Sequence, residues 1–235
     1  MNDRAAAPTR FPTTLKLAVF DLDGTLKAAQ SPYHFVHRAL GVDAEAAQIH
    51  LRYQRGDLDY TEWGQQEIGL WRGLPVEKLR SIVRTIPYLP GALCFVRRLK
   101  AAGVTVALIS AGFGVHVELC AAELSVDVTI CNHVEVTGGR LTGELLGDVG
   151  NGNKGRLVRE LQVRNGVSCA ETLAAGDTLA DVQMFSEAAV SVAVAPAEPA
   201  VAEAADLLLP DGNWARAWEL IEVIRPGWLP ARKAR

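Results

Sequence analysis

The sequence lacks several features that would assign it to a specialised class of protein. It contains no apolar run near the roughly 18 residues of a bilayer-spanning helix, and its net charge of −3 leaves no basic excess for binding a phosphate backbone. Its few cysteines include no C-x-x-C pair, so we expect buried intracellular thiols and no zinc site. These cysteines are Cys94, Cys120, Cys131 and Cys169. We therefore expect a cytoplasmic protein with no nucleic-acid partner and no membrane contact.

Neither end of the chain has the pattern of a folded element. Residues 1–14 are rich in Ala, Pro and Thr and lack the apolar middle of a secretion signal, so we expect a disordered leader. Residues 225–235 carry four basic side chains and predict a solvated, disordered tail. With 235 residues, of which 49% are hydrophobic, the chain is long enough for a large domain with a small insert.

Short apolar runs that end in Gly, Ser or Asp predict buried strands. These strands are expected at residues 15–20, 104–109, 126–130, 172–175, 190–194 and 207–209. Residues 134–145 alternate around Gly138-Gly139 and predict a β-hairpin, and helical patterns separate most of the other strands. This alternation predicts an α/β protein whose core, residues 15–28 and 89–224, is a Rossmann-like, doubly wound and mostly parallel sheet.

Residues 29–88 show helix start and stop signals and no strand pattern. Ser31-Pro32 supplies an N-cap and a first-turn proline, and Asp59 with Glu62 three residues later forms a capping pair. Four helices are expected, at residues 31–41, 43–56, 59–73 and 76–85. The segment therefore predicts a small all-helical cap inserted after the first strand, and such a cap is the natural candidate for a lid.

Several side chains of this cap are candidates for contact with a ligand. His34 and His37 lie three apart on the first helix, but no carboxylate or thiol has the spacing of a further zinc ligand, so we expect both at the cap surface. Aromatic residues at helical spacing are mostly core, and we expect one or two of four to meet a substrate. The four are Tyr33, Tyr60, Trp63 and Trp71.

The most informative stretch is Asp21-Leu22-Asp23-Gly24-Thr25, which follows the first strand. Alternation along an extended chain points Asp21 and Asp23 to the same side and turns Leu22 into the core. Two carboxylates about 4 Å apart repel by roughly 4 kcal/mol at an effective dielectric near 20, unless a cation or a shared proton relieves the repulsion. Gly24 permits the sharp turn that follows.

Other polar residues lie where the expected strands end or where a helix begins. They are Ser110, Lys154, Asp177 and Asp181. The carboxyl ends of parallel strands share one rim, so these side chains should converge with the two aspartates after the first strand. The carboxylates suit Mg²⁺. The Ser110 hydroxyl and the Lys154 ammonium would bind an anion, as would the N–H groups of Ala111 and Gly112 at a helix N-terminus. Together these groups predict phosphoryl transfer with a carboxylate nucleophile.

The four motifs, in this order and strand context, resemble those of the haloacid dehalogenase (HAD) superfamily of hydrolases. The likeness covers about residues 15 to 210, and it points to the phosphoserine-phosphatase-like branch, which has a helical C1-type cap after the first motif. The resemblance implies a Mg²⁺-dependent phosphatase that acts on a small phosphorylated metabolite through an aspartyl-phosphate. It also implies a monomer or a homodimer.

The resemblance assigns catalytic and phosphate-binding roles to the motif residues. Asp21 would attack phosphorus, and Asp23 would protonate the leaving oxygen and then activate water. Dehalogenases of the superfamily lack an acid at the second position, so Asp23 points to a phosphatase or phosphomutase. Ser110, the two N–H groups that follow it and Lys154 would hold the phosphoryl oxygens.

The resemblance also implies the metal ligands. Mg²⁺ would be held by the Asp21 carboxylate, the Asp23 backbone carbonyl and Asp177. Asp181 would bind through a metal-bound water or would brace Lys154. These assignments rest on the family motifs and not on the spacing of the residues alone.

Two cap positions depart from the phosphoserine-phosphatase pattern. In that branch a Glu after the first motif and an Arg in the cap recognise serine, and this chain has Gln30 and Glu67 there. A carboxylate in a closed pocket repels a substrate carboxylate, so we expect phosphoserine not to be the preferred substrate. Arg52, Arg55 or Arg72 could restore carboxylate binding from another helix turn. The candidate substrate contacts in the cap are Gln30, Tyr60, Glu67 and Arg55.

Three alternatives stay open at this point. Phosphoserine phosphatase proper and a phosphotransferase to another alcohol share the chemistry and differ in what the closed site admits. A catalytically silent phosphate-binding module would have lost a motif aspartate or lysine, and all are present; Ala180, where the family usually has Asn, is the one departure in its favour.

The G-x-G-x-x-G match at residues 150–155 follows a hairpin, which argues against a dinucleotide site. His116 and His133 have no evident partner.

Overall fold

The computed structural model describes residues 13–231, and across this range it contains one sheet of seven strands in the order β4-β3-β2-β1-β5-β6-β7. Neighbouring strands are parallel except β3 and β4, which form an antiparallel hairpin. The strands are β1 (Leu17–Phe20), β2 (Thr105–Phe113), β3 (Val128–Thr137), β4 (Arg140–Leu146), β5 (Thr172–Gly176), β6 (Val190–Val194) and β7 (Leu207–Leu209). The helices are α1 (Pro32–Leu40), α2 (Asp43–Gln54), α3 (Tyr60–Gly69), α4 (Val76–Val83), α5 (Ala92–Ala101), α6 (Gly114–Leu124), α7 (Lys154–Asn165), α8 (Val182–Phe185), α9 (Pro199–Glu203) and α10 (Ala217–Ile224).

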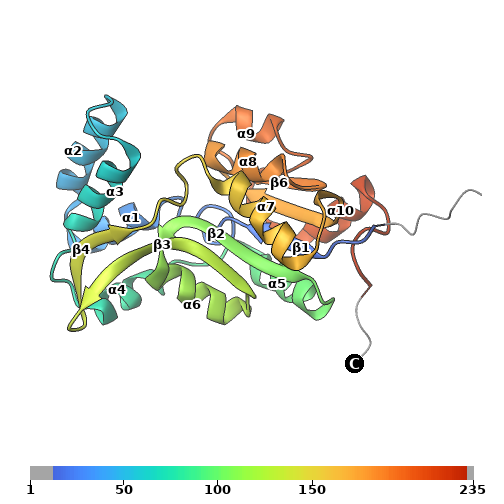
Figure 1. Cartoon of the computed structure of the whole chain (residues 1–235), viewed down its shortest axis with the longest axis horizontal. Helices are drawn as coiled ribbons and strands as arrows, with labels where there is room; N and C mark the ends of the chain where they lie inside the picture. The colour runs from blue at the N-terminus through green and yellow to red at the C-terminus, as the bar shows by residue number, and fades with distance from the viewer. Residues whose placement is uncertain (1–12, 232–235) are drawn as a thin grey trace, which may run out of the picture.

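Residues alternate between two apolar layers along the central strands. On β1, Ala18 and Phe20 face one side of the sheet, and Leu17 and Val19 face the other. Side chains of α5, α6 and α10 pack on the first side, and side chains of α7, α8 and α9 pack on the second. Figure 1 shows helices lying on both faces of the sheet. Burial on both faces explains the continuous apolar runs of the sequence and confirms the doubly wound, mostly parallel α/β core.

The structure joins two elements that the sequence predicted separately. The strand expected at residues 126–130 and the first strand of the hairpin are one continuous strand, β3, which leaves the core sheet and ends at the hairpin turn. The prediction divided it because polar Asn132 interrupts the apolar pattern. Asn132 is buried, but its amide donates to the Ala111 and Val149 carbonyls and accepts from the Val149 N–H, so burial costs it no hydrogen bond.

The tail predicted to be disordered is ordered over the part that the structure describes. Trp228 is 1% exposed, and its indole N–H donates to the Ala170 carbonyl (2.9 Å). The Trp228 carbonyl accepts from the Leu15 N–H (2.9 Å), and Leu229 is also buried. The prediction was wrong here because it weighed the basic charges and overlooked two large apolar side chains. The leader prediction for residues 1–12, and the tail prediction for residues 232–235, lie outside the described residues.

The four cysteines are free thiols, as predicted, but only two of them are buried. Cys120 and Cys131 lie in the core, whereas Cys94 and Cys169 are exposed. Cys94 falls outside the apolar stripe of α5, so the prediction of burial was wrong there. Across the described range, no helix combines the length and the apolar character needed to span a bilayer.

The inserted segment folds into the four predicted helices. Ser31 caps α1 by accepting a hydrogen bond from the His34 N–H (3.2 Å), and Asp59 with Glu62 forms the predicted capping box of α3. Local side-chain capping therefore fixes where α1 and α3 begin.

The apolar core of this cap is completed by the hairpin of the core sheet. Phe113 from the end of β2 packs in it, together with Val134 and Leu141 from β3 and β4. The Gln65 side chain joins α3 to β4 by donating to the Gly143 carbonyl (2.7 Å). Figure 1 shows the hairpin reaching out of the core toward α1–α4. The cap is helical in sequence, but it folds around a hairpin that the core supplies.

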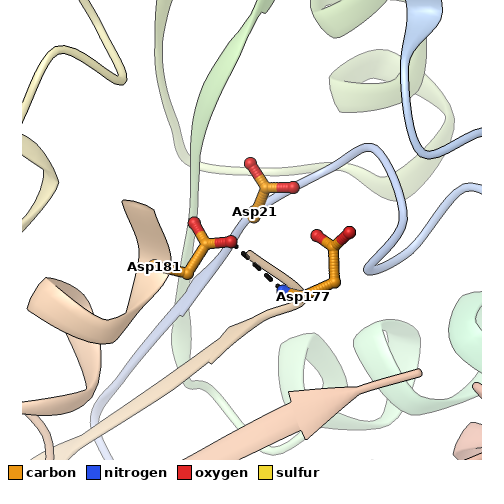
Figure 2. A group of neighbouring side chains, drawn as sticks. All are labelled: Asp21, Asp177 and Asp181. Atoms are coloured by element: carbon orange, nitrogen blue, oxygen red, sulfur yellow. Dashed lines mark hydrogen bonds between the residues drawn. The ribbon is translucent and has the colours of Figure 1, made fainter. Parts of the chain in front are cut away.

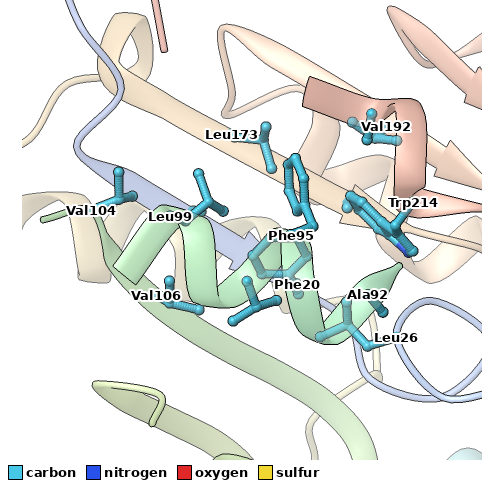
Figure 3. Close-up of a cluster of buried hydrophobic side chains, with 14 of the residues drawn as sticks. Phe20, Leu26, Ala92, Phe95, Leu99, Val104, Val106, Leu173, Val192 and Trp214 are labelled. Atoms are coloured by element: carbon cyan, nitrogen blue, oxygen red, sulfur yellow. The ribbon is translucent and has the colours of Figure 1, made fainter. Parts of the chain in front are cut away.

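Trp214 connects the core to the acidic turn after β1. It is 1% exposed, and its ring centroid lies 5.6 Å from that of Phe20 and 4.8 Å from that of Phe95 (Figure 3). Its indole N–H donates to the Thr25 carbonyl (2.8 Å). The ring therefore stabilises the core and the turn together.

Replacing Trp214 with alanine should lower the free energy of unfolding by about 3–5 kcal/mol, because the change opens a cavity in the core. It also leaves the Thr25 carbonyl without its donor. Urea denaturation measures the loss. The matched control is Trp218→Ala in α10, where the ring is only partly buried and a smaller loss is expected. Equal losses in the two variants would contradict this account of Trp214.

Candidate active site

Asp21 and Asp23 lie at the carboxyl end of β1 and face the same cavity. The Asp21 N–H donates to the Ala175 carbonyl of β5 (2.9 Å) and so extends the sheet ladder past β1. Both aspartates line a cavity of about 180 Å³, while Leu22 is buried in the core. The two carboxyl groups therefore lie on one side of the chain, as the alternation of extended backbone predicts.

Lys154, the first residue of α7, lies between the carboxylates of Asp21 and Asp181. Its ammonium donates to Oδ1 of Asp21 (2.7 Å) and to Oδ1 of Asp181 (2.6 Å), and all three side chains are buried. Burial acts to lower the pKa of Lys154, but the two carboxylates outweigh it and raise that pKa. Lys154 is therefore held as a charged group in a buried place. Its contact with Asp181 agrees with the expectation that Asp181 braces Lys154.

Asp21, Asp177 and Asp181 form a carboxylate cluster from separate segments of the chain (Figure 2). One oxygen of each lies within 4.8 Å of the others. Oδ2 of Asp181 accepts from the N–H groups of Asp177 (3.1 Å) and Thr178 (3.0 Å), which fixes the loop after β5. Within residues 13–231 the Asp23 carboxylate does not belong to this cluster. A metal role for Asp23 through its backbone carbonyl stays a prediction.

Gly24 allows the acidic turn to approach Asp177. Its φ is +82°, and a Cβ there would lie 2.0 Å from Oδ2 of Asp177. The next residue, Thr25, donates its hydroxyl to Oδ1 of Asp177 (3.1 Å). Glycine is required at this position both by the conformation and by the close approach.

The cluster carries more negative than positive charge. Burial raises the pKa of Asp177, and the neighbouring Asp21 and Asp181 carboxylates raise it further. Burial also raises the pKa of Asp21; the Lys154 ammonium lowers it, but not enough to cancel the effect of burial and of the other carboxylates. A hard divalent cation with oxygen ligands would remove this imbalance. The donor set therefore fits Mg²⁺.

The groups expected to bind an anion differ in one respect from the prediction, namely in their secondary structure. Ser110 is buried and lines the cavity with Ala111 and Gly112. All three residues belong to β2, and α6 begins only at Gly114, so the prediction of a helix N-terminus at Ala111 and Gly112 is wrong. The reason is a register shift against β3, which carries β2 beyond its apolar run. The Gly112 N–H donates to Oγ of Ser110 (3.0 Å), and phosphate binding by these groups stays a prediction.

The cap covers the cavity with aromatic side chains. Tyr33, Tyr60 and Trp63 line it together with Gln30, while Trp71 is buried inside the cap. The Tyr33 hydroxyl donates to the carbonyl of Ala111 (3.2 Å), and the Tyr60 hydroxyl donates to that of Val149 (2.9 Å). Three of the four aromatic candidates line the cavity, and two of them join the cap to the core; the expectation that one or two meet a substrate stays a prediction.

The cationic candidates of the cap lie away from the cavity. Arg55 is exposed at the end of α2, and Arg52 and Arg72 make hydrogen bonds at the surface. Among the described residues that line the cavity, Lys154 is the only cation. The expectation that one of these arginines could restore carboxylate binding is therefore not supported, because helix spacing alone did not show which way they face.

Glu67 is buried inside the cap and does not line the cavity. Oε2 of Glu67 lies 3.4 Å from Nδ1 of His37, and neither carboxylate oxygen has a well-formed hydrogen bond within the described chain. Burial raises the pKa of Glu67 to about 7, opposed by the Trp63 indole, and burial lowers the pKa of His37. The prediction that His37 lies at the cap surface is wrong, because α1 turns this residue toward α3; His34 is exposed, as predicted.

His116 is a site residue that the sequence did not reveal. Its Nε2 lies 2.9 Å from Oδ1 of Asp23, and both side chains are buried. Burial acts to lower the pKa of His116, but the Asp23 carboxylate outweighs it and raises that pKa to about 9. The two residues are 93 positions apart, so spacing could not show the contact. His133, the other histidine without an expected partner, only approaches the exposed Glu118 (4.0 Å).

Comparison with known proteins identifies relatives of this chain. A family model described as haloacid dehalogenase-like hydrolase matches residues 18–186. A phosphoserine phosphatase of Methanocaldococcus jannaschii is 30% identical over 195 residues, which are 83% of this chain and 92% of that protein. A phosphoserine phosphatase of Archaeoglobus fulgidus is 35% identical over 179 residues; the match covers 76% of this chain but only about half (52%) of that longer protein.

Solved structures agree with these sequence matches. The structure of a phospho-aspartyl intermediate analogue of phosphoserine phosphatase superposes with a TM-score of 0.76 at 27% identity. The superposition covers 88% of this chain and 99% of that one. The similarity therefore extends over both the core and most of the segment inserted after β1.

Replacing Glu67 with glutamine should stabilise the protein above pH 7. The pKa of Glu67 is raised in the folded chain, so stability falls as the pH rises from about 4.5, the ordinary value, to about 7, and the full loss persists above that. Glutamine carries no charge. The gain in free energy of unfolding should be about 1–3 kcal/mol at pH 8 and should shrink toward zero at pH 4.5.

Urea denaturation at pH 4.5, 6 and 8 measures this difference. The matched control is Glu45→Gln, at an exposed glutamate in the first turn of α2, where no gain is expected and removing the charge near the helix N-terminus should cost at most about 1 kcal/mol at pH 8. A Glu67→Gln variant less stable than the wild type at pH 8 would contradict the account. It would mean that the charged carboxylate gains more from His37 than burial costs it.

Proposed function

The chain belongs to the haloacid dehalogenase-like hydrolase family, in its phosphoserine-phosphatase-like branch, and we propose that it is a Mg²⁺-dependent phosphatase of a small phosphorylated metabolite. The observation that carries the proposal is the placement of the Asp21 and Asp23 carboxyl groups in one small cavity, with Lys154 bonded to Asp21. A nucleophile, a proton donor and a cation for an anionic substrate thus lie within one enclosed site.

The proposed reaction has two steps, each balanced in protons. In the first, an oxygen of Asp21 bonds to phosphorus while the ester P–O bond breaks, and the leaving oxygen takes a proton from Asp23. In the second, water attacks the phosphorus of the aspartyl-phosphate, gives a proton to Asp23 and releases the Asp21 carboxylate. Lys154 keeps Asp21 in place through both steps, because its ammonium is held from the other side by Asp181.

Asp21 and Asp177 are the carboxylates that would hold Mg²⁺, with Asp181 completing the cluster. Bound Mg²⁺ would offset the charge of the phosphoryl oxygens and of the acidic cluster. Ser110 lines the same cavity and would hydrogen-bond a phosphoryl oxygen. Support for the metal comes from the excess of buried carboxylate over ammonium: three carboxylates lie within 4.8 Å of one another, and Lys154 is the ammonium that contacts two of them.

The cap supports a substrate whose alcohol part carries no carboxylate. The cap residues that line the cavity are Gln30, Ser31, Pro32, Tyr33, Tyr60 and Trp63. Lys154 is the only described cation lining the cavity, and it is already paired with two carboxylates. A substrate carboxylate would therefore be buried without a partner, which costs several kcal/mol. We propose that phosphoserine is a poor substrate and that a neutral or apolar phosphomonoester is preferred.

A phosphate-release screen over phosphorylated metabolites, with Mg²⁺ and with EDTA, tests the proposal. We expect Mg²⁺-dependent release, with phosphoserine below neutral alkyl phosphates in kcat/KM by roughly tenfold or more. Asp21→Asn is the matched inactive control and should lose at least about 1,000-fold, because the amide cannot attack phosphorus. Repeating the assay with added alcohols separates hydrolysis from phosphoryl transfer.

Two results would count against this function. Release from phosphoserine above all neutral esters would contradict the substrate proposal and leave the chemistry standing. No Mg²⁺-dependent release from any ester, or substantial activity of Asp21→Asn, would contradict the phosphatase proposal and favour a silent phosphate-binding module.

A further inference from the structure

The two carboxylate oxygens of Asp23 have different surroundings. Oδ1 is 2.9 Å from Nε2 of His116. Oδ2 is also buried, yet it has no hydrogen-bond partner within residues 13–231. Oδ2 lies on the side of Gly112, where a Cβ would come within 2.9 Å of it, and both residues line the cavity. One oxygen of Asp23 is therefore held by His116, and the other has no partner among the described residues.

His116 is fixed in the orientation that makes this contact. It is the third residue of α6, the helix that begins directly after β2, and it is 1% exposed. Its other ring nitrogen, Nδ1, lies 3.9 Å from Sγ of Cys120, one helical turn later. The ring of Phe113 packs at 6.2 Å between centroids. The imidazole is therefore enclosed on its far side, and Nε2 is the nitrogen directed at Asp23.

The geometry points to His116 as a positioning residue for the proton transfer, an inference that rests on the proposed function. An ionised carboxylate can only accept a hydrogen bond, so Nε2–H donates to Oδ1 and fixes the rotation of the carboxyl group. Oδ2 is then the oxygen that carries the proton to the leaving group. As the ester P–O bond breaks, its electrons stay on the leaving oxygen, and that oxygen receives the proton from Oδ2. In the second step Oδ2 regains a proton from the attacking water.

A purely structural role for His116 makes a different prediction. If the imidazole only filled space next to a buried aspartate, its loss would reduce activity on all esters by the same factor. A positioning role slows the first step of an alkyl ester more than that of an aryl ester, since the aryl ester leaves as a stable phenolate and needs little proton transfer. The second step is the same for both esters, so the leaving-group dependence of kcat/KM, which reports only the steps up to release of the alcohol, separates the two roles.

The test compares His116→Gln with His116→Asn, on p-nitrophenyl phosphate and on an alkyl phosphate, with Mg²⁺. The Gln amide nitrogen can occupy the place of Nε2 and donate to Oδ1, whereas the Asn amide is one methylene too short. We expect the aryl-to-alkyl ratio of kcat/KM to rise about 10- to 100-fold in His116→Asn and to stay within about threefold of the wild type in His116→Gln.

Two further variants calibrate this ratio. Asp23→Asn gives the rise expected when proton transfer is lost entirely. His133→Asn makes the same substitution at an exposed histidine and should leave the ratio unchanged. Thermal melts of all variants show that the comparison is made on folded protein.

The outcomes separate this inference from the proposed function. An equal loss on both esters in His116→Asn, or an unchanged ratio, would overturn the positioning role while the phosphatase stands. A ratio that rises equally in the Gln and Asn variants would also overturn it, since Gln keeps the donor. Absence of phosphate release by the wild type from either ester would overturn the phosphatase proposal, and the positioning role with it.

Discussion

The bond from the Lys154 ammonium to Asp21 and Asp181 is the interaction on which the site depends. It joins the end of β1, the start of α7 and the loop after β5, three segments far apart in the chain. Removing the lysine would leave two buried carboxylates without a counter-charge, a change that typically costs about 3–5 kcal/mol. Yet one ammonium does not balance Asp21, Asp177 and Asp181 together. The remaining negative charge is the reason that we propose this cluster as a Mg²⁺ site.

The convergence of the core site residues could be predicted because it follows from one rule. Strands β1, β2 and β5 are parallel, so polar residues at their carboxyl ends must share a rim, and Asp21, Ser110 and Asp177 lie there. The contacts of His116 could not be predicted in this way, because they depend on how α6 rotates against the acidic turn. Glu67 was read as a pocket residue for a similar reason: its position on α3 was known, but the direction of that helix face was not.

Cap and core divide the function between them. The core supplies the carboxylates and the lysine, whereas Tyr33, Tyr60 and Trp63 of the cap close the cavity. The hydroxyls of Tyr33 and Tyr60 bond to core carbonyls, and the apolar side chains of the cap pack on Phe113, Val134 and Leu141 of the core. We propose that the core groups carry out the same reaction on any bound ester, and that the cap side chains select which ester binds.

The most direct test of this account is the thermal midpoint of the metal-free protein titrated with Mg²⁺ at constant ionic strength. At 100 times its Kd, a bound ion stabilises the native state by about 2.7 kcal/mol, or roughly 5–10 °C for a chain of this size. We predict such a rise for the wild type and little or none for Asp177→Asn, which removes a carboxylate of the cluster. An unchanged midpoint in the wild type, or an equal rise in both proteins, would contradict the claim that the buried carboxylates form a Mg²⁺ site.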